Sequence, residues 1–235
     1  MLIAERNGML VKGGYTARDY VQDGLVFQLD ALENAGYGIR DTSKLEWLDL
    51  IGGVLFRKEY GIWSWGEYAL IGEKTDDFKS VSPLPLSLSD SYTIEIVITS
   101  NPDNPTRKTI NPSSGIRINS WGFGFFYTFG TACATGSDNI LLWGCPWTIA
   151  ELGAMRSLSM SVGEGNLRVY GDGGRDHKVY TSTQYGSFTN SHVNLSPAYG
   201  EPNYKIHAVR FYSRALTADE IAANYAVDKA RFNLP

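Results

Sequence analysis

The residues best suited to ligand chemistry in this sequence are aromatic. Five of them occupy alternate positions of one segment and would share one face of a strand: Trp121, Phe123, Phe125, Tyr127 and Phe129. Such a stripe can stack against sugar rings, and the glycines between its members would let a ligand approach the backbone. The stripe can also be hydrophobic core. We favour core for the middle three aromatics, whereas Trp121 at the strand end could reach a rim.

Four other tryptophans are candidates for recognition. Trp63 and Trp65 share one side of a short segment, and Trp143 and Trp147 flank Gly144-Cys145-Pro146. Exposed tryptophans are frequent anchors of binding surfaces. We therefore predict that these four residues and Trp121 contribute to glycan binding.

Groups suited to catalysis are sparse. Glu95 is the only carboxylate inside a strong predicted strand, and its same-face neighbours are neutral. A lone strand glutamate is expected to be solvated or salt-bridged. The three histidines lack an activating serine or cysteine and lack zinc-ligand spacing: His177, His192 and His207. We predict that the protein is not an enzyme and that His207 is a structural side chain.

Cys133 and Cys145 are the only cysteines. They could close the loop 134–144 as a disulfide, or they could be two reduced thiols. We favour the reduced thiols.

Length and composition predict one domain. The chain has 235 residues, 43% hydrophobic and 13% aromatic, with 25 glycines, which is typical of many short strands joined by tight turns. The net charge of −4 gives no basis for a nucleic-acid surface. No apolar run approaches the roughly 20 residues that a membrane-spanning helix needs.

The first residues do not read as a secretory signal, because Glu5 and Arg6 follow only three apolar residues after Met1. We expect synthesis in a host cytoplasm without export. Residues 1–20 are polar and rich in glycine, and we interpret them as an anchoring or assembly arm. Residues 21–235 would then form the folded domain.

The pattern along the chain is mostly strands and turns. Leu25–Asp30 alternates with a period of two and predicts a half-buried strand, and residues 92–99 predict another. Residues 47–53 read as a turn-rich connection. Further strands are expected at 68–71, 116–119, 121–130, 158–162, 167–170, 178–183 and 205–211. A helix is expected at 218–231, because Thr217 and Glu220 have capping-box spacing.

Two segments, 23–36 and 209–221, and the hairpin Tyr170-Gly-Asp-Gly resemble laminin-G-like and concanavalin A-like jelly-roll modules. The matching positions are Leu25, Asp30, Asn34, Gly36, Trp47, Asp49, Gly52, Tyr170, Gly173, Val209, Tyr212, Arg214, Leu216, Glu220 and Ile221. The resemblance implies an all-β sandwich of two antiparallel sheets with one short C-terminal helix. In this match, Arg210 and Arg214 are expected to brace the rim. The acidic string Glu-x-Asp-x-x-Glu of the laminarinase-like enzymes with this fold does not occur here.

The resemblance also raises the question of calcium, because laminin-G-like modules often hold Ca²⁺ at the sandwich rim through oxygen ligands. The candidate ligands are Asp30, Asn34, Asp49 and Asp172. These residues lack dense spacing, and an aspartate at a turn usually accepts from its own backbone. We therefore predict no cofactor and keep calcium as the alternative.

Modules of this kind serve as lectins, adhesins and virion components, so the resemblance leaves three hypotheses. The leading one is a non-catalytic structural or adhesive virion protein of a bacteriophage, such as a decoration, fibre or tail-associated subunit. Its arm would contact other virion subunits in a homo-oligomer, and its domain would bind a host-surface glycan. The second is a carbohydrate-binding module (a lectin) at a bacterial cell surface. The third is a glycoside hydrolase.

Overall fold

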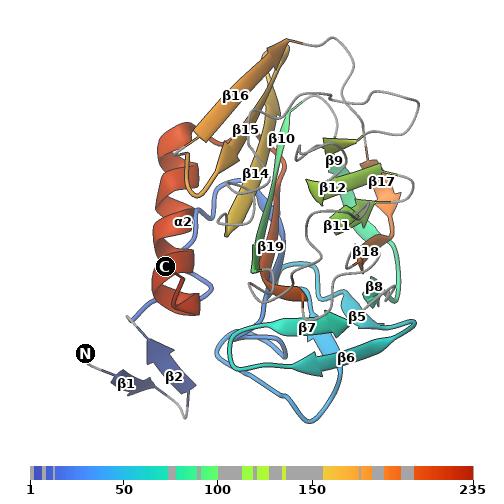
Figure 1. The fold of residues 1–235 in the computed structure, drawn as a ribbon, viewed down its shortest axis with the longest axis vertical. Helices are drawn as coiled ribbons and strands as arrows, with labels where there is room; N and C mark the ends of the chain where they lie inside the picture. The colour runs from blue at the N-terminus through green and yellow to red at the C-terminus, as the bar shows by residue number, and fades with distance from the viewer. Residues whose placement is uncertain are drawn as a thin grey trace, which may run out of the picture.

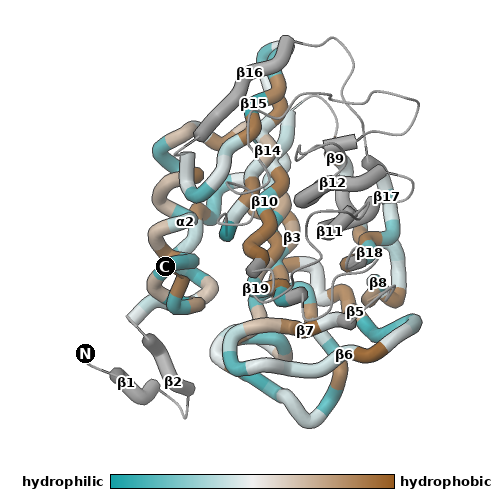
Figure 2. The backbone as a smooth tube through the Cα atoms, viewed as in Figure 1, coloured by the Kyte–Doolittle hydropathy of each residue, from teal (hydrophilic) through white to brown (hydrophobic). Residues whose placement is uncertain are grey.

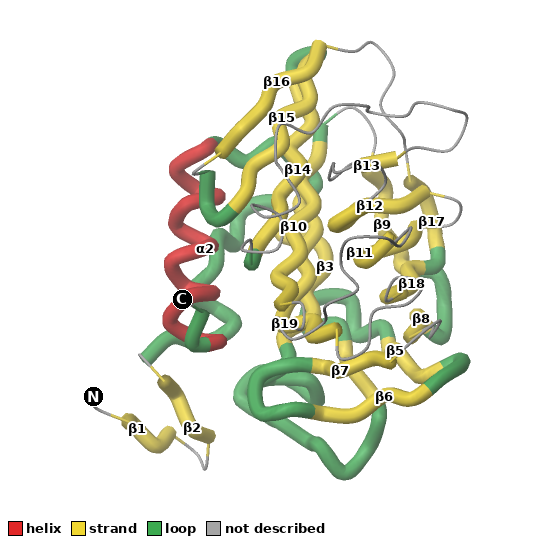
Figure 3. The backbone as a smooth tube through the Cα atoms, in the orientation of Figure 1, coloured by secondary structure: helices red, strands yellow, loops and turns green. Residues whose placement is uncertain are grey.

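The computed structural model describes residues 3–6, 9–12, 14–73, 78–88, 91–99, 113–118, 121–126, 134–135, 156–174, 176–181, 188–196 and 204–234. Within these residues two antiparallel sheets form the layers of a sandwich, and α2 (Ala218–Phe232) lies on the outer face of one of them (Figures 1 and 3). All strand pairs in the two layers are antiparallel.

The layer next to α2 has eight strands among the described residues. Its order is β16 (Asp176–Thr181), β15 (Asn166–Gly171), β14 (Ser157–Gly163), β10 (Tyr92–Thr99), β19 (Tyr204–Tyr212), β7 (Leu70–Glu73) and β6 (Ile62–Trp65), with β3 (Leu25–Asp30) also paired to β19.

In the part of the chain that the structure describes, the second layer has seven strands. Its order is β13 (Ala134–Thr135), β12 (Trp121–Phe126), β11 (Ser113–Ile118), β18 (Val193–Ser196), β8 (Phe78–Ser80), β5 (Leu55–Lys58) and β4 (Glu46–Leu48). Two separate pairs complete the strands: β1 (Ile3–Arg6) with β2 (Met9–Lys12), and β9 (Leu84–Leu88) with β17 (Phe188–Ser191).

The hydrophobic core lies between the two layers. Phe27 of β3 packs on Phe56 of β5 with 5.7 Å between ring centroids, and on Phe211 of β19 at 4.6 Å. Apolar residues are dense along β3, β10 and β19 (Figure 2). Full burial of one large apolar side chain stabilises the fold by about 2 kcal/mol, so this cluster is the main source of stability.

Strand β3 is more buried than its alternation predicts. Gln28 and Asp30, on the face expected to meet solvent, are 0% exposed. Helix α2 and residues 14–21 cover that face, since Arg231 of α2 binds Asp30 and the Gln28 amide donates to the Ala17 carbonyl at 2.8 Å. A covering element distant in sequence therefore changes the strand from half-buried to fully buried.

The boundary expected between residues 20 and 21 lies elsewhere. The Ala17 N–H donates to Glu33 Oε1 at 2.8 Å, and the Val21 N–H donates to Asn224 Oδ1 at 2.9 Å. Tyr20 is buried. Residues 14–20, which were assigned to the arm, thus pack on the folded domain, and the β1–β2 pair forms a separate sheet outside the sandwich (Figure 1).

A buried ionic network joins α2 to the eight-stranded sheet. Arg210 of β19 binds both carboxylate oxygens of Asp228 at 2.8 and 2.7 Å, and its Nε donates to Glu95 at 2.8 Å. Asn224 Nδ2 also donates to Glu95, at 2.8 Å. Burial raises the pKa values of Glu95 and Asp228, and the Arg210 charge opposes that rise. Of the two states expected for Glu95, solvated or salt-bridged, the structure shows the second.

A second buried arginine lies further along the helix. Arg231 binds Asp30 at 2.8 Å and Glu33 at 3.1 Å. Both arginines attach α2 by charge-assisted hydrogen bonds, which are stronger than neutral ones, and Ile221, Val227 and Phe232 add apolar contacts.

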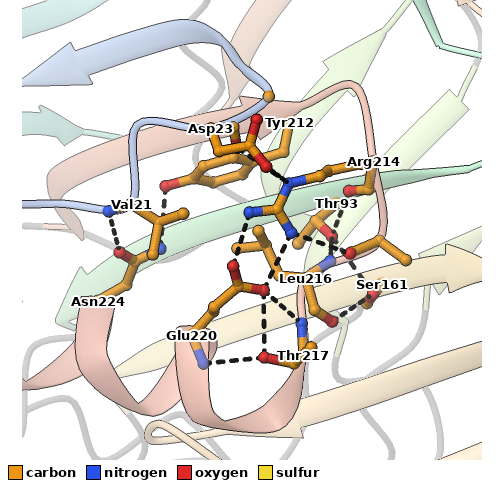
Figure 4. A network of polar contacts seen from close by, with 12 residues as sticks. Val21, Asp23, Thr93, Ser161, Tyr212, Arg214, Leu216, Thr217, Glu220 and Asn224 are labelled. Atoms are coloured by element: carbon orange, nitrogen blue, oxygen red, sulfur yellow. Dashed lines mark hydrogen bonds and ion pairs between the residues drawn. The ribbon is translucent and has the colours of Figure 1, made fainter.

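The start of α2 has the predicted capping box. The Glu220 N–H donates to Thr217 Oγ1, and the Thr217 N–H donates to the Glu220 carboxylate (Figure 4). Arg214 binds Glu220 at 2.6 Å and Asp23 at 2.8 Å, so it braces the start of the helix against residues 21–24. These hydrogen bonds, led by that from Arg214, lower the pKa of Glu220 to about 2. The rim position expected for Arg210 is wrong, because its side chain is buried between β10 and α2.

We expect Thr217→Ala to lower the free energy of unfolding by about 1 kcal/mol, the usual effect of losing an N-cap hydroxyl. Urea denaturation followed by circular dichroism measures the change. Thr217→Ser keeps the hydroxyl and serves as the control. Equal stability of the alanine and serine variants would contradict the role of the cap.

Several short strands have no counterpart in the sequence-based prediction. Residues 47–53 were expected to be a turn-rich connection, yet Glu46–Leu48 forms β4 and pairs with β5. Strands of three or four residues are too short to display alternation, and pairing with a neighbour is what orders them.

None of the helices in the described ranges combines the length and the apolar character that a bilayer crossing requires.

Candidate binding site

The candidate site is a hollow at the β4 edge of the seven-stranded sheet. Its volume is about 220 Å³, and it is lined by Asn34, Ala35, Asp41, Lys44, Glu46, Leu48 and Leu55. The lining joins the loop 34–44 to strands β4 and β5. Leu48 and Leu55 are direct register partners and provide an apolar floor, while the loop provides most of the polar wall.

The Asn34 side chain fixes the conformation of the loop by three hydrogen bonds to its backbone and to β4. Its Nδ2 donates to the carbonyls of Asp41 at 2.7 Å and Glu46 at 3.1 Å, and its Oδ1 accepts from the Asp41 N–H at 2.9 Å. One amide therefore closes the segment 34–46 into a fixed turn. The hollow is preformed, which reduces the entropy lost on binding.

The other side of the loop is attached to the β6–β7 hairpin. Trp65 Nε1 donates to the Lys44 carbonyl at 2.8 Å, and the Arg40 guanidinium donates to the Gly66 carbonyl. The Trp65 ring meets Trp47 edge to face, with 5.3 Å between centroids. Trp47 is anchored in turn, because its Nε1 donates to the Asp30 carbonyl at 3.0 Å. Trp65 therefore holds the loop by a hydrogen bond, and Trp47 holds Trp65 by a ring contact.

The charges around the hollow are mixed. Hydrogen bonds from Ser43, the side-chain bond first, lower the pKa of Asp41 and keep its carboxylate ionised. Glu46 pairs with Arg57 of β5 at 2.9 Å, and Lys44 adds a second cation. The wall offers the carboxylate acceptors of Asp41 and Glu46 beside the Lys44 ammonium donor. This combination suits a ligand that carries many hydroxyl groups, since each hydroxyl both donates and accepts.

The predicted glycan-binding tryptophans have different environments. Trp63 is 4% exposed and packs against Phe78 in the core, so its burial does not fit a surface role. Trp65 is partly buried on the same side of β6, as the spacing predicted, and stands behind the hollow. Trp121 begins β12 opposite Ile118 of β11. Its side chain lies outside the described residues, as do Trp143 and Trp147.

The four calcium candidates all act as hydrogen-bond partners within the protein. Asp30 Oδ1 accepts from Arg231 and from the Leu32 N–H, and Asn34 holds the loop already described. Asp49 accepts from three backbone N–H groups, with burial raising its pKa. Asp172 accepts from the Arg156 and Ser157 N–H groups.

The described residues contain no group of three or more His, Cys, Asp or Glu arranged to hold a metal ion. The contacts of the four candidates favour the turn-stabilising role over a calcium site. Cys133, Cys145 and the stripe beyond residue 126 lie outside the described residues.

A second hollow of about 290 Å³ lies at the C-terminal end of α2, between Phe232–Leu234 and the β6–β7 turn. Its lining includes the buried His207. The His207 ring is tilted against the Phe232 ring with 5.3 Å between centroids, and its Nδ1 is 2.8 Å from the Tyr68 carbonyl oxygen. Burial lowers the pKa of His207 to about 4. The burial of this imidazole and its contact with the Tyr68 carbonyl fit the structural role predicted for it.

Sequence reasoning did not find Asp41, Lys44 or Glu46. The residues between Gly38 and Trp47 show no motif and no periodicity, so they read as an ordinary polar turn. Asn34 was named as a candidate calcium ligand and Trp65 as a glycan-binding residue. In the folded chain both side chains hydrogen-bond to the loop 34–44.

Comparisons with known proteins identify the fold. The binding domain of botulinum neurotoxin serotype D aligns with a TM-score of 0.63 at 11% identity, over 87% of this chain and 52% of that one. The serotype G binding domain aligns at 0.56 and 13% identity, over 88% and 51%. Trypanosoma rangeli sialidase in complex with the inhibitor DANA aligns at 0.53 and 12% identity, over 87% and 33%.

No protein-family model and no curated protein matches the sequence. The chain spans about half of the neurotoxin binding domains and about a third of the sialidase that it resembles. At such low identity the likeness concerns the fold. The chain is a concanavalin A-like β-sandwich of antiparallel sheets with a C-terminal helix.

Proposed function

We propose that this protein is a non-catalytic glycan-binding module, and that the hollow between loop 34–44 and the β4–β5 edge is its binding site. The observation that carries the proposal is the preformed wall of mixed charge over the apolar floor of Leu48 and Leu55. A sugar ring has the matching chemistry, because its hydroxyls lie at the edge and its C–H groups form an apolar face.

The state of the carboxylates supports binding over hydrolysis. A glycoside hydrolase needs one carboxylic acid with a raised pKa to protonate the leaving group. In the hollow, the pKa of Asp41 is lowered, and Glu46 is paired with Arg57. Glu95, the strand carboxylate selected from the sequence, is buried with Arg210 and is remote from solvent.

A glycan array followed by calorimetry on the best binders tests the proposal. We expect Asp41→Asn and Lys44→Gln each to weaken binding about tenfold, the usual effect of losing a charge-assisted hydrogen bond. Lys205→Gln, at the second hollow, is the matched control and should leave affinity unchanged. The site assignment fails if Lys205→Gln weakens binding while Lys44→Gln does not, and absence of all glycan binding would refute the function.

We further propose that the module acts as a structural or adhesive subunit of a bacteriophage particle. The β1–β2 pair supports this reading, because a two-stranded sheet that belongs to neither layer is marginal in water by itself and gains stability from a partner. We expect residues 3–12 to contact other virion subunits and the protein to form a homo-oligomer. Mass spectrometry across a density gradient of source lysate should place the chain with intact particles at stoichiometric level. A chain confined to soluble or envelope fractions would refute the virion role.

A further inference from the structure

The face of the seven-stranded sheet that points away from the core extends the candidate site across the strands. Residues that face outward in neighbouring strands are paired in register: Glu46 with Arg57, Arg57 with Lys79, and Lys79 with Asn194. We call these four residues the polar row. They come from β4, β5, β8 and β18, so the row runs perpendicular to the strands.

An apolar row lies beside the polar row. Leu48 and Leu55 are register partners, and the Val81 N–H donates to the Leu55 carbonyl at 2.8 Å. Val81 is 56% exposed. The alternation of burial along β4 and β5 shows that both rows are on the outer face, because Trp47 and Phe56 between them are fully buried.

Both rows begin in the hollow, since Glu46, Leu48 and Leu55 are part of its lining. Four strands are separated by three spacings of about 4.8 Å, so the polar row is about 14 Å long. A single pyranose ring is shorter than this distance. The surface therefore continues well beyond a site for one sugar.

The far end of the polar row carries an unused acceptor. Asn194 Oδ1 is buried and has no hydrogen-bond partner among the described residues. A buried acceptor without a partner is costly, and a donor supplied by a ligand would remove that cost. Lys79 stands next to it, with its Nζ 3.7 Å from Glu59 and its side chain 38% exposed.

From this arrangement we propose that the module binds a linear oligosaccharide laid across β4, β5, β8 and β18, with one terminal unit in the hollow. The polar row hydrogen-bonds the hydroxyls along one edge of the chain, and the apolar row contacts the C–H faces. This inference rests on the proposed glycan-binding function and adds the length and direction of the ligand.

The test uses ladders of neutral oligosaccharides, namely cello-, malto- and chito-oligosaccharides of one to six units, with affinity measured by calorimetry. For the ladder that binds, we expect affinity to rise about tenfold from one unit to three and then to level off. Lys79→Gln and Asn194→Ala should remove this gain while leaving the binding of one unit unchanged. Asp41→Asn should weaken every length equally, and Lys205→Gln should weaken none.

Amide chemical shifts provide a second readout that does not depend on affinity. Trimers should perturb β8 and β18, whereas the single unit should perturb only loop 34–44, β4 and β5. Affinity independent of chain length, with the single unit still bound in the hollow, would overturn the extended site and leave the proposed function intact. Failure of every ladder and of the array would overturn both.

Discussion

Arg210→Met should lower the free energy of unfolding by about 3–5 kcal/mol, the largest effect that we expect from one substitution. The Arg210 side chain is 1% exposed and compensates two buried carboxylates, Glu95 and Asp228. Without the guanidinium, both carboxylates would be left charged in a dry interface, or they would have to take up protons. Helix α2 would lose its bidentate contact with β19.

Two companions make the result interpretable. Arg57→Met removes a surface pair with Glu46 in which the arginine side chain is 57% exposed, and it should cost no more than about 1 kcal/mol. The triple variant Arg210→Met, Glu95→Gln, Asp228→Asn removes the uncompensated charge and should recover part of the loss. Urea unfolding at neutral pH gives all three values. A loss for Arg210→Met no greater than that for Arg57→Met would show that the network contributes little.

The second large effect is a loss of folding stability at acidic pH that is due to His207. His207 has a pKa lowered from 6.5 to about 4 by burial, so the unfolded chain takes up a proton at higher pH than the folded one. The stability due to neutral His207 is present above pH 6.5 and is lost as the pH falls through about 4. A depression of this size corresponds to about 3 kcal/mol over that window.

The comparison of wild type with His207→Gln isolates this contribution. The glutamine amide can still donate to the Tyr68 carbonyl, but it does not titrate. We expect the stability of the wild type relative to the variant to fall by about 3 kcal/mol between pH 7.5 and 4. The carboxylates of the Arg210 network titrate in both proteins and cancel in the difference. Parallel pH profiles for the two proteins would contradict the burial of a neutral imidazole.

The elements that sequence reasoning found have local causes. Strand β10 alternates over eight residues, and the α2 capping box joins Thr217 to a residue three positions away. Such signals are complete within a few residues. They remain readable whatever the rest of the chain does.

The elements that it missed depend on partners distant in sequence. Strands β4 and β8 have three residues each and are ordered by pairing with β5. Residues 14–20 were assigned to an arm, yet the Tyr15 carbonyl accepts a hydrogen bond from Arg231 across 216 positions. No local pattern announces such a contact.

The candidate site also depends on contacts between residues that are distant in sequence. The amino-acid pattern was sufficient for the longer strands and the capped helix, because alternation and capping act over neighbouring residues. The sandwich itself was implied by the resemblance of segments 23–36 and 209–221 to jelly-roll modules. The position of loop 34–44 beside β4, the burial of Trp63 and the alignment of Glu46, Arg57, Lys79 and Asn194 all required the folded chain. A binding surface is built across strands, and cross-strand neighbours are set by register and packing, which link residues that the sequence keeps far apart.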